Sequence, residues 1–207
     1  MIDVVDGKGN RFKCRILDPN PKGTDLEIVE KIPDGKKWKG YITLAVAPTK
    51  NNDRVSWLVE KAVEIGVDRI VFIDCKHNER HKISAERMRK VAVAAMKQSL
   101  KTTLPVIDDL VPLDSFIKEG TEEGENVQKF FGYCDDSTRR KDFCREFRSG
   151  EDAIILIGPE GDFSKEEVKK LVDNDFIPVT FGEMRLRTET AALFGLQAFH
   201  ILNSLHN

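Results

Sequence analysis

From residue 41 onward, apolar runs of strand length alternate with segments of helical periodicity, and this alternation constrains the fold more than any other feature. Parallel strands need crossover connections, and these are usually helices. Alternating strands and helices therefore indicate a parallel sheet whose two faces are covered by the helices. Residues 154–157, in the run AIILIG, are apolar throughout, as expected of a strand buried on both faces. The sequence therefore predicts an α/β fold built on a mostly parallel sheet.

The order of the elements can be predicted from apolar periodicity and from helix-capping residues. A first helix begins near Asn52 or Asp53 and ends at Gly66, and a second runs from Ser84 to about residue 100. Ser164 and Glu167 form a capping box that begins a third helix. The acidic segment 118–126 is expected to be an exposed loop. The remaining predicted elements are strands at 41–47, 69–73, 104–107, 130–133 and 179–181, and a terminal helix at Thr188–Leu205.

The N-terminal residues have a different pattern, with short strands at 2–5, 12–17 and 26–29 and a glycine-containing turn at 6–10. A cluster of proline, glycine and lysine at 33–40 then has the composition of a linker. We therefore expect two domains. Residues 1–38 form a small β-rich domain, and residues 39–207 form the α/β domain.

Bulk composition limits the function classes without choosing one. The net charge is only -2, with 33 basic against 35 acidic residues, so an RNA partner has to be sought in local patches. We expect no membrane association and a cytoplasmic location, because the sequence has no apolar run of transmembrane length and no secretory signal pattern. The four cysteines are scattered, and nothing completes a ligand set around His77 and His81, so no metal site is expected.

Two strand-to-helix connections carry the features expected of a ligand site. The first, IGPEGDFS at 157–164, places glycines at the carboxyl end of a strand, where parallel sheets bind ligands. The second, FGEMRLRTETAA at 181–192, brings Arg185 and Arg187 to the start of an apolar helix, where positive charge opposes the helix dipole unless an anion is near. The alternatives are an ordinary turn for the first connection and solvated loop charges for the second.

Taken together, IGPEGDFSKEE and FGEMRLRTETAA resemble the RsmE group of SPOUT methyltransferases, which methylate N3 of a uridine in small-subunit ribosomal RNA. The resemblance continues upstream through APTK at 47–50, WLVEKAVEIGV at 57–67 and NER at 78–80. It implies a SPOUT trefoil-knotted parallel sheet with a short, incomplete N-terminal PUA-like β domain. The chain departs from the group's pattern at Lys101, Asp162 and Met184-Arg185, and we interpret these departures as variation.

The resemblance also implies a cofactor, S-adenosylmethionine, held by backbone groups of both connections. The residues expected to bind it are Leu156, Ile157, Gly158, Pro159, Glu160, Gly161, Phe181, Gly182, Leu186, Arg187 and Thr190. For catalysis we expect Arg187 to stabilise charge or position the uridine, and Glu189 to orient that arginine or accept the proton. Glu160 is an alternative proton acceptor. Helix capping and loop hydrogen bonds remain open as roles for both glutamates.

The expected partners are 16S ribosomal RNA in the small ribosomal subunit and a second copy of the chain, packed through the terminal helix in a homodimer. Packing of that helix inside its own domain is the alternative. Basic residues gather between residues 76 and 101, and such a local excess attracts phosphates without fixing sequence. The candidate RNA-binding residues are Lys50, Arg80, Lys82, Arg87, Lys97 and Lys101.

Two other functions remain open at this point. One is a SPOUT ribose 2'-O-methyltransferase acting on tRNA or rRNA. The other is a non-catalytic RNA-binding factor for ribosome assembly that keeps the fold without the chemistry.

Overall fold

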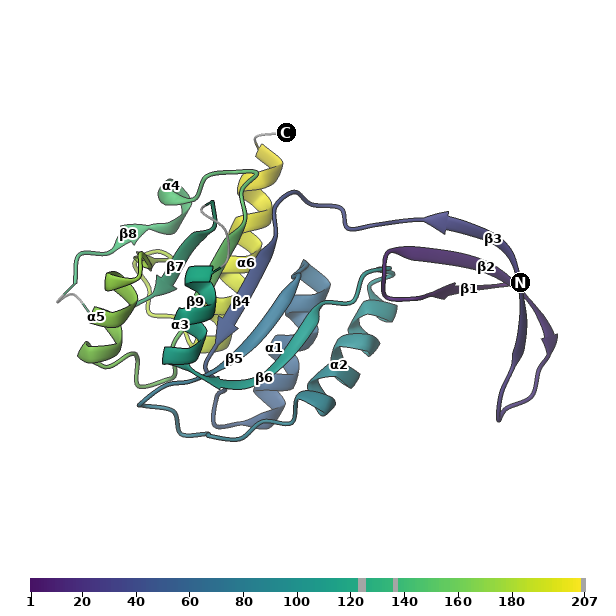
Figure 1. Cartoon of the computed structure of the whole chain (residues 1–207), viewed down its shortest axis with the longest axis horizontal. Coiled ribbons are helices and arrows are strands. Elements are labelled where there is room, and N and C mark those ends of the chain that lie inside the picture. The colour runs from purple at the N-terminus through teal and green to yellow at the C-terminus, as the bar shows by residue number, and fades with distance from the viewer. Residues whose placement is uncertain (123–125, 136–137, 206–207) are drawn as a thin grey trace.

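The computed structural model describes residues 1–122, 126–135 and 138–205, which form two sheets (Figure 1). The smaller sheet is antiparallel, with the order β1-β2-β3, and consists of β1 (Ile2–Val5), β2 (Asn10–Asp18) and β3 (Asp25–Pro33). The larger sheet has seven strands in the order β6-β5-β4-β9-β7-β10-β8, and every neighbouring pair is parallel. The predicted α/β class with a parallel sheet and a small β-rich N-terminal part is confirmed.

The large sheet is built around two central strands whose residues are all buried, β4 (Ile42–Val46) and β9 (Ala153–Ile157). Because side chains alternate along a strand, Ile155 and Ile157 pack on one face while Ile154 and Leu156 pack on the other. The other strands are β5 (Arg69–Asp74), β6 (Val106–Pro112), β7 (Gln128–Gly132), β8 (Lys141–Asp142) and β10 (Ile177–Thr180).

Helices cover both faces of this sheet (Figure 1). On one face lie α1 (Asn52–Ile65), α2 (Ala85–Gln98), the short α4 (Phe143–Glu146) and α6 (Thr188–Leu205). On the other lie α3 (Leu113–Glu122) and α5 (Lys165–Asp173), which begins with the predicted capping box of Ser164 and Glu167. No helix of the described part of the chain is long and apolar enough to cross a membrane.

Several predicted boundaries were wrong. The segment 118–126 is not wholly a loop, because α3 extends to Glu122 and buries Phe116 and Ile117 against the sheet; residues 123–125 lie outside the described residues. The strand expected at 104–107 begins later, at Val106, because the Leu104 N–H donates to the carbonyl of Gly7 in the N-terminal part. The sequence pattern did not predict α4 or β8. The first helix is capped by Asn51, one residue before the expected position.

The glycine-containing turn at 6–10 attaches the small sheet to the large domain. The Gly9 N–H donates to the Thr102 carbonyl over 2.9 Å, and Lys8 forms an isolated antiparallel bridge with Thr103. Gly7 has a φ of +72°, and a Cβ there would lie 3.2 Å from Cβ of Leu104. A glycine is therefore needed at this turn both for the backbone conformation and for close contact.

Candidate active site

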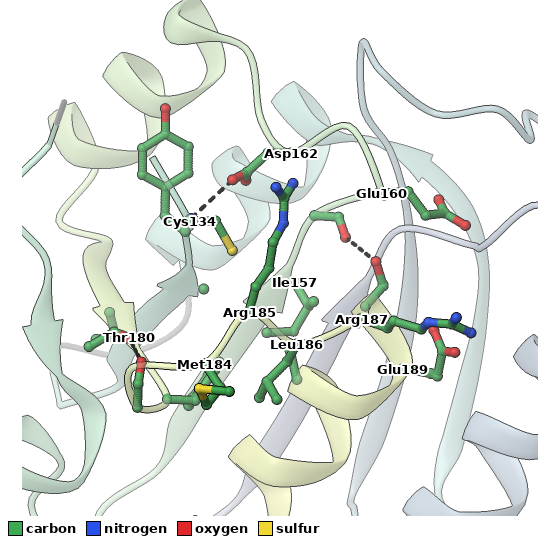
Figure 2. A pocket seen from close by; sticks show the side chains of 18 of the residues that line it. Cys134, Ile157, Glu160, Asp162, Thr180, Met184, Arg185, Leu186, Arg187 and Glu189 are labelled. Carbon is green, nitrogen blue, oxygen red and sulfur yellow. Dashed lines mark hydrogen bonds between the residues drawn. The ribbon is translucent and has the colours of Figure 1, made fainter. Parts of the chain in front are cut away.

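A cavity of about 550 Å³ opens at the carboxyl ends of β7, β9 and β10, between the two connections that the sequence singled out (Figure 2). This volume falls within the roughly 300–1,000 Å³ typical of small-molecule sites. The position agrees with the rule that parallel sheets bind ligands at their carboxyl edge. The residues expected from sequence that line it are Ile157, Gly158, Pro159, Glu160, Phe181, Gly182, Leu186, Arg187 and Glu189.

Three of the residues expected to bind the cofactor do not line the cavity. Leu156 is fully buried on the opposite face of the sheet, among residues that pack against α3 and α5. Gly161 lies beside His77, whose Nδ1 is 3.1 Å from the Gly161 carbonyl oxygen. Thr190 is exposed, one residue beyond Glu189 in the first turn of α6. The structure thus places most of the residues expected to bind the cofactor around the cavity, but not these three.

Gly182 shapes one wall of the cavity. Its φ of +115° is unfavourable for any residue with a side chain, and nothing lies within 4 Å of the position a Cβ would take. The hydroxyl of Thr180 donates to the Gly182 carbonyl over 2.6 Å and fixes the turn (Figure 2). The backbone is therefore open to a ligand at this point, and a side chain here would project into unfilled space.

The opposite wall is fixed by contacts around Gly158. The buried hydroxyl of Thr188 donates to the Gly158 carbonyl over 3.1 Å, which joins the two connections directly. A Cβ at Gly158 would lie 2.9 Å from the ring of Phe163, so that ring packs closely against the strand end. These contacts hold the two connections at a fixed separation, with apolar side chains such as Ile157 and Leu186 between them.

At one end of the cavity a carboxylate lies among arginines (Figure 2). Asp162 accepts hydrogen bonds from the backbone N–H groups of Cys134 and Phe163, at 3.0 and 2.9 Å. Burial raises the pKa of the Asp162 carboxyl above its ordinary value, although these hydrogen bonds and the charge of Arg185 act in the opposite direction. Arg140 lines the same end and donates to the Tyr133 carbonyl over 3.1 Å.

The other end of the cavity carries a second set of charges. Glu189, in the first turn of α6, is 7% exposed and lies 3.6 Å from a guanidinium nitrogen of Arg54 in α1. Glu160 accepts a hydrogen bond from the backbone N–H of Lys50 over 3.2 Å. Within the described residues, the side chain of Arg187 has neither an ion pair nor a hydrogen bond, although it lines the cavity next to Glu189 (Figure 2).

The structure separates the candidate RNA-binding residues into two groups. Lys50, Arg80, Lys82 and Arg87 lie near the carboxyl edge of the sheet, where Lys50 pairs with Glu79 and Arg87 with Asp53. Arg80 is half-buried, and its guanidinium donates to the carbonyls of Thr49 and Lys50.

Lys97 and Lys101 lie at the far end of α2, where that helix meets the N-terminal sheet (Figure 1). Burial lowers the pKa of the Lys101 ammonium, whereas the charge of Glu64 acts in the opposite direction. The six residues therefore do not form one continuous surface.

Sequence reasoning missed the lining residues that come from outside the two connections. Arg54 comes from the first turn of α1, and Tyr133, Cys134 and Arg140 follow β7. Inside the connections, Asp162 had been noted only as a departure from a pattern, and Arg185 had been noted as a charge at a helix start without a role at the site. A basic residue at a helix start beside the carboxyl edge was the one signal that could have indicated Arg54. No cluster of three or more metal-ligating side chains occurs in the described ranges.

Comparison with known proteins gives consistent results. Residues 36–200 match the model of the RNA methyltransferase domain family. Ribosomal RNA small subunit methyltransferase E of Mesomycoplasma hyopneumoniae is 30% identical over 192 residues, which cover 89% of this chain and 79% of that protein.

Two solved structures have the same fold. A probable rRNA-methyltransferase from Porphyromonas gingivalis has a TM-score of 0.92 and 40% identity, covering 100% of this chain and 86% of that one. The ribosomal RNA small subunit methyltransferase E of Neisseria gonorrhoeae, whose crystal structure is bound to S-adenosyl methionine, has a TM-score of 0.84 and 21% identity over 97% of this chain and 83% of that one. The chain therefore belongs to the RNA methyltransferase domain family and, within it, to the RsmE group that the two connections resemble.

Proposed function

We propose that this protein methylates N3 of a uridine in 16S ribosomal RNA and uses S-adenosylmethionine as the methyl donor. The observation that carries the proposal is the cavity between the 157–162 and 181–189 connections, at the carboxyl edge of a parallel sheet. Membership of the RNA methyltransferase family supports the reaction class. The relatives named ribosomal RNA small subunit methyltransferase E support the RNA.

The residues present fit this cofactor. The open backbone at Gly182 and the apolar side chains of Ile157 and Leu186 suit a flat base, which van der Waals contact and backbone hydrogen bonds can hold. Asp162 and Arg185, at one end, offer opposite charges to the zwitterionic amino-acid part. When bound, S-adenosylmethionine supplies an electrophilic methyl group on a sulfonium.

The protein's own part in the chemistry is to make N3 of the uridine nucleophilic. This nitrogen carries a proton that has to leave, and the negative charge that develops has to be stabilised. We assign that stabilisation to Arg187, whose guanidinium lines the cavity and has no internal ion pair among the described residues. Glu189 and Glu160 lie at the same end, where either carboxylate could receive the proton or orient an arginine.

Calorimetry with S-adenosylmethionine tests the cofactor site. Gly182→Trp would place an indole in the open space where nothing lies within 4 Å of the Cβ position, and we expect it to abolish binding. Gly150→Trp is a matched control, because Gly150 also has a positive φ, +88°, and open space, but does not line the cavity. Wild-type protein without measurable binding, or Gly182→Trp that binds like Gly150→Trp, would overturn the assignment.

We further propose that the protein acts as a cytoplasmic homodimer, with α6 at the interface. Phe194 and Ile201 of this helix are large apolar side chains at 42% and 49% exposure, and Leu205 near its end is 69% exposed. Burial of such side chains against a second copy would be favourable. We also propose that the chain divides into two domains after residue 38. The antiparallel sheet then belongs to a partial PUA-like RNA-binding domain at residues 1–38.

A further inference from the structure

We infer that Arg54 is a substrate-binding residue that holds a backbone phosphate of the RNA at the mouth of the cavity, and that Glu189 positions it there. The inference rests on the proposed function. It assigns a role to a residue that lies outside both of the connections that resemble the family, and it assigns Glu189 to positioning rather than to proton transfer.

Glu189 carries a buried carboxylate that needs a partner. Glu189 is 7% exposed, and a buried charge is costly unless a partner compensates for it. The partner that the structure provides is Arg54, at 3.6 Å, and not the neighbouring Arg187. The N-terminal end of α6 adds a favourable dipole, since Glu189 lies in its first turn. Both effects compensate for the charge of the buried carboxylate and suit a fixed anchor.

Arg54 keeps hydrogen-bond donors that Glu189 does not use. A guanidinium has five N–H donors in a rigid plane, and one carboxylate uses only one edge of it. The Arg54 side chain is 44% exposed and lines the cavity, so it is accessible from the space that the substrate enters. The contact with Glu189 involves one guanidinium nitrogen, Nη1, so it orients an arginine whose other donors can bind a phosphate.

Other arginines lie close to Arg54. Arg187 lines the same cavity. A guanidinium nitrogen of Arg87 lies 3.5 Å from a carboxylate oxygen of Asp53, the residue before Arg54. Three guanidinium groups, those of Arg54, Arg87 and Arg187, therefore lie at or near this end of the site, and that of Arg187 has no carboxylate partner among the described residues. A polyanionic backbone would be attracted along this edge, whereas the base would enter the cavity itself.

The test measures binding and turnover with small ribosomal subunits from a strain that lacks the gene. We expect Arg54→Ala to weaken binding to these particles by roughly tenfold, as for a lost hydrogen bond to a charged group. The slope of log affinity against log salt concentration should fall by about one, as for the loss of one phosphate contact. Affinity for S-adenosylmethionine should stay near the wild-type value. The melting temperature should fall, because the buried Glu189 carboxylate loses its partner, so binding is compared at a temperature at which both proteins are folded.

Arg148→Ala is the matched control, because Arg148 also pairs with a glutamate, Glu151, but lies before β9 at the other end of the sheet. Glu189→Gln should raise KM for the particles and leave kcat near the wild-type value. The double variant should bind the particles about as weakly as Arg54→Ala alone, because both changes disrupt the same Arg54–Glu189 pair.

An unchanged salt slope in Arg54→Ala would overturn the phosphate contact. A selective loss of S-adenosylmethionine affinity would assign Arg54 to the cofactor instead. A fall in kcat at constant KM in Glu189→Gln would return Glu189 to proton transfer and overturn its positioning role. Failure of the wild-type protein to bind S-adenosylmethionine would count against the proposed function and is distinguishable from all three.

Discussion

At the scale of single residues, the sequence predicted the parts of the site that lie on contiguous segments. Glycine and arginine at strand ends indicated Gly158, Gly182 and Arg187, and all three line the cavity. Arg54 and Cys134 could not be found in this way, because only the packing of α1 and the end of β7 against α6 and β9 brings them there. A local sequence pattern carries no information about such tertiary contacts.

Asp162 illustrates a departure from the family pattern that the structure explains. Its φ of +59° is in the left-handed region, where aspartate is tolerated better than most side chains. The carboxylate uses both oxygens, one on the Cys134 N–H and one on the Phe163 N–H. A glycine would adopt this backbone conformation without strain but could not join the two loops. Aspartate at this position therefore lacks the conformational freedom of glycine but provides hydrogen bonds that join the two loops.

Cysteine labelling offers a test of where the ligand binds. Cys134 and Cys144 are both exposed and free, and burial raises the pKa of both thiols, but only Cys134 lines the cavity. With S-adenosylhomocysteine well above its Kd, we expect alkylation of Cys134 at mildly alkaline pH to slow by more than roughly tenfold. The rate at Cys144 should not change. Peptide mass spectrometry reads both rates, and equal protection of the two thiols would place the ligand elsewhere.

At the scale of elements, long amphipathic helices and fully buried strands were predicted well. The helix at 188–205 has the expected bounds, and the fully buried strand expected at 154–157 begins only one residue earlier, at Ala153. The elements that the sequence pattern did not predict are short or rich in acidic residues. The α3 helix was missed because its polar residues obscure Phe116 and Ile117, and β8, with only two residues, owes its existence to pairing with β10. Tertiary contacts decide such segments.

The helix α6 is anchored by His200, whose Nε2 lies 2.8 Å from the Gly66 carbonyl oxygen at the end of α1. The imidazole ring also packs edge-on against Trp38 and Phe199. Burial lowers the pKa of His200, with smaller contributions of the same sign from Lys101 and Lys36; the Gly66 hydrogen bond and Asp68 oppose the shift. A neutral His200 is thus the form that stabilises the fold.

A depressed folded-state pKa predicts how stability depends on pH. The contribution of His200 is fully present above its ordinary value of 6.5 and is lost as pH falls through the lower folded-state value. We expect the free energy of unfolding to decrease between about pH 7 and about pH 5, and His200→Gln to remove that part of the decrease. Urea unfolding across this range measures the effect. An identical pH dependence in the two proteins would show that His200 is not responsible.

At the scale of the whole molecule, the cavity and the N-terminal sheet lie at different ends of the large domain (Figure 1). The residues expected to contact RNA divide between these ends, with Lys50 and Arg87 near the cavity and Lys97 and Lys101 near the small sheet. The sequence predicted a local excess of basic residues between 76 and 101, because these residues are close together along the chain. The direction of α2 separates them in space. An RNA that contacts both groups would have to extend along α2.

The most direct measurement is nucleoside mass spectrometry of 16S rRNA from a strain that lacks the gene, before and after incubation of its small subunits with purified protein and S-adenosylmethionine. We predict that N3-methyluridine is missing from that RNA, that wild-type protein and Gly150→Trp restore it, and that Gly182→Trp does not. N3-methyluridine still present in the deletion strain, or loss of a 2'-O-methyl nucleoside with base methylation intact, would contradict the proposed function.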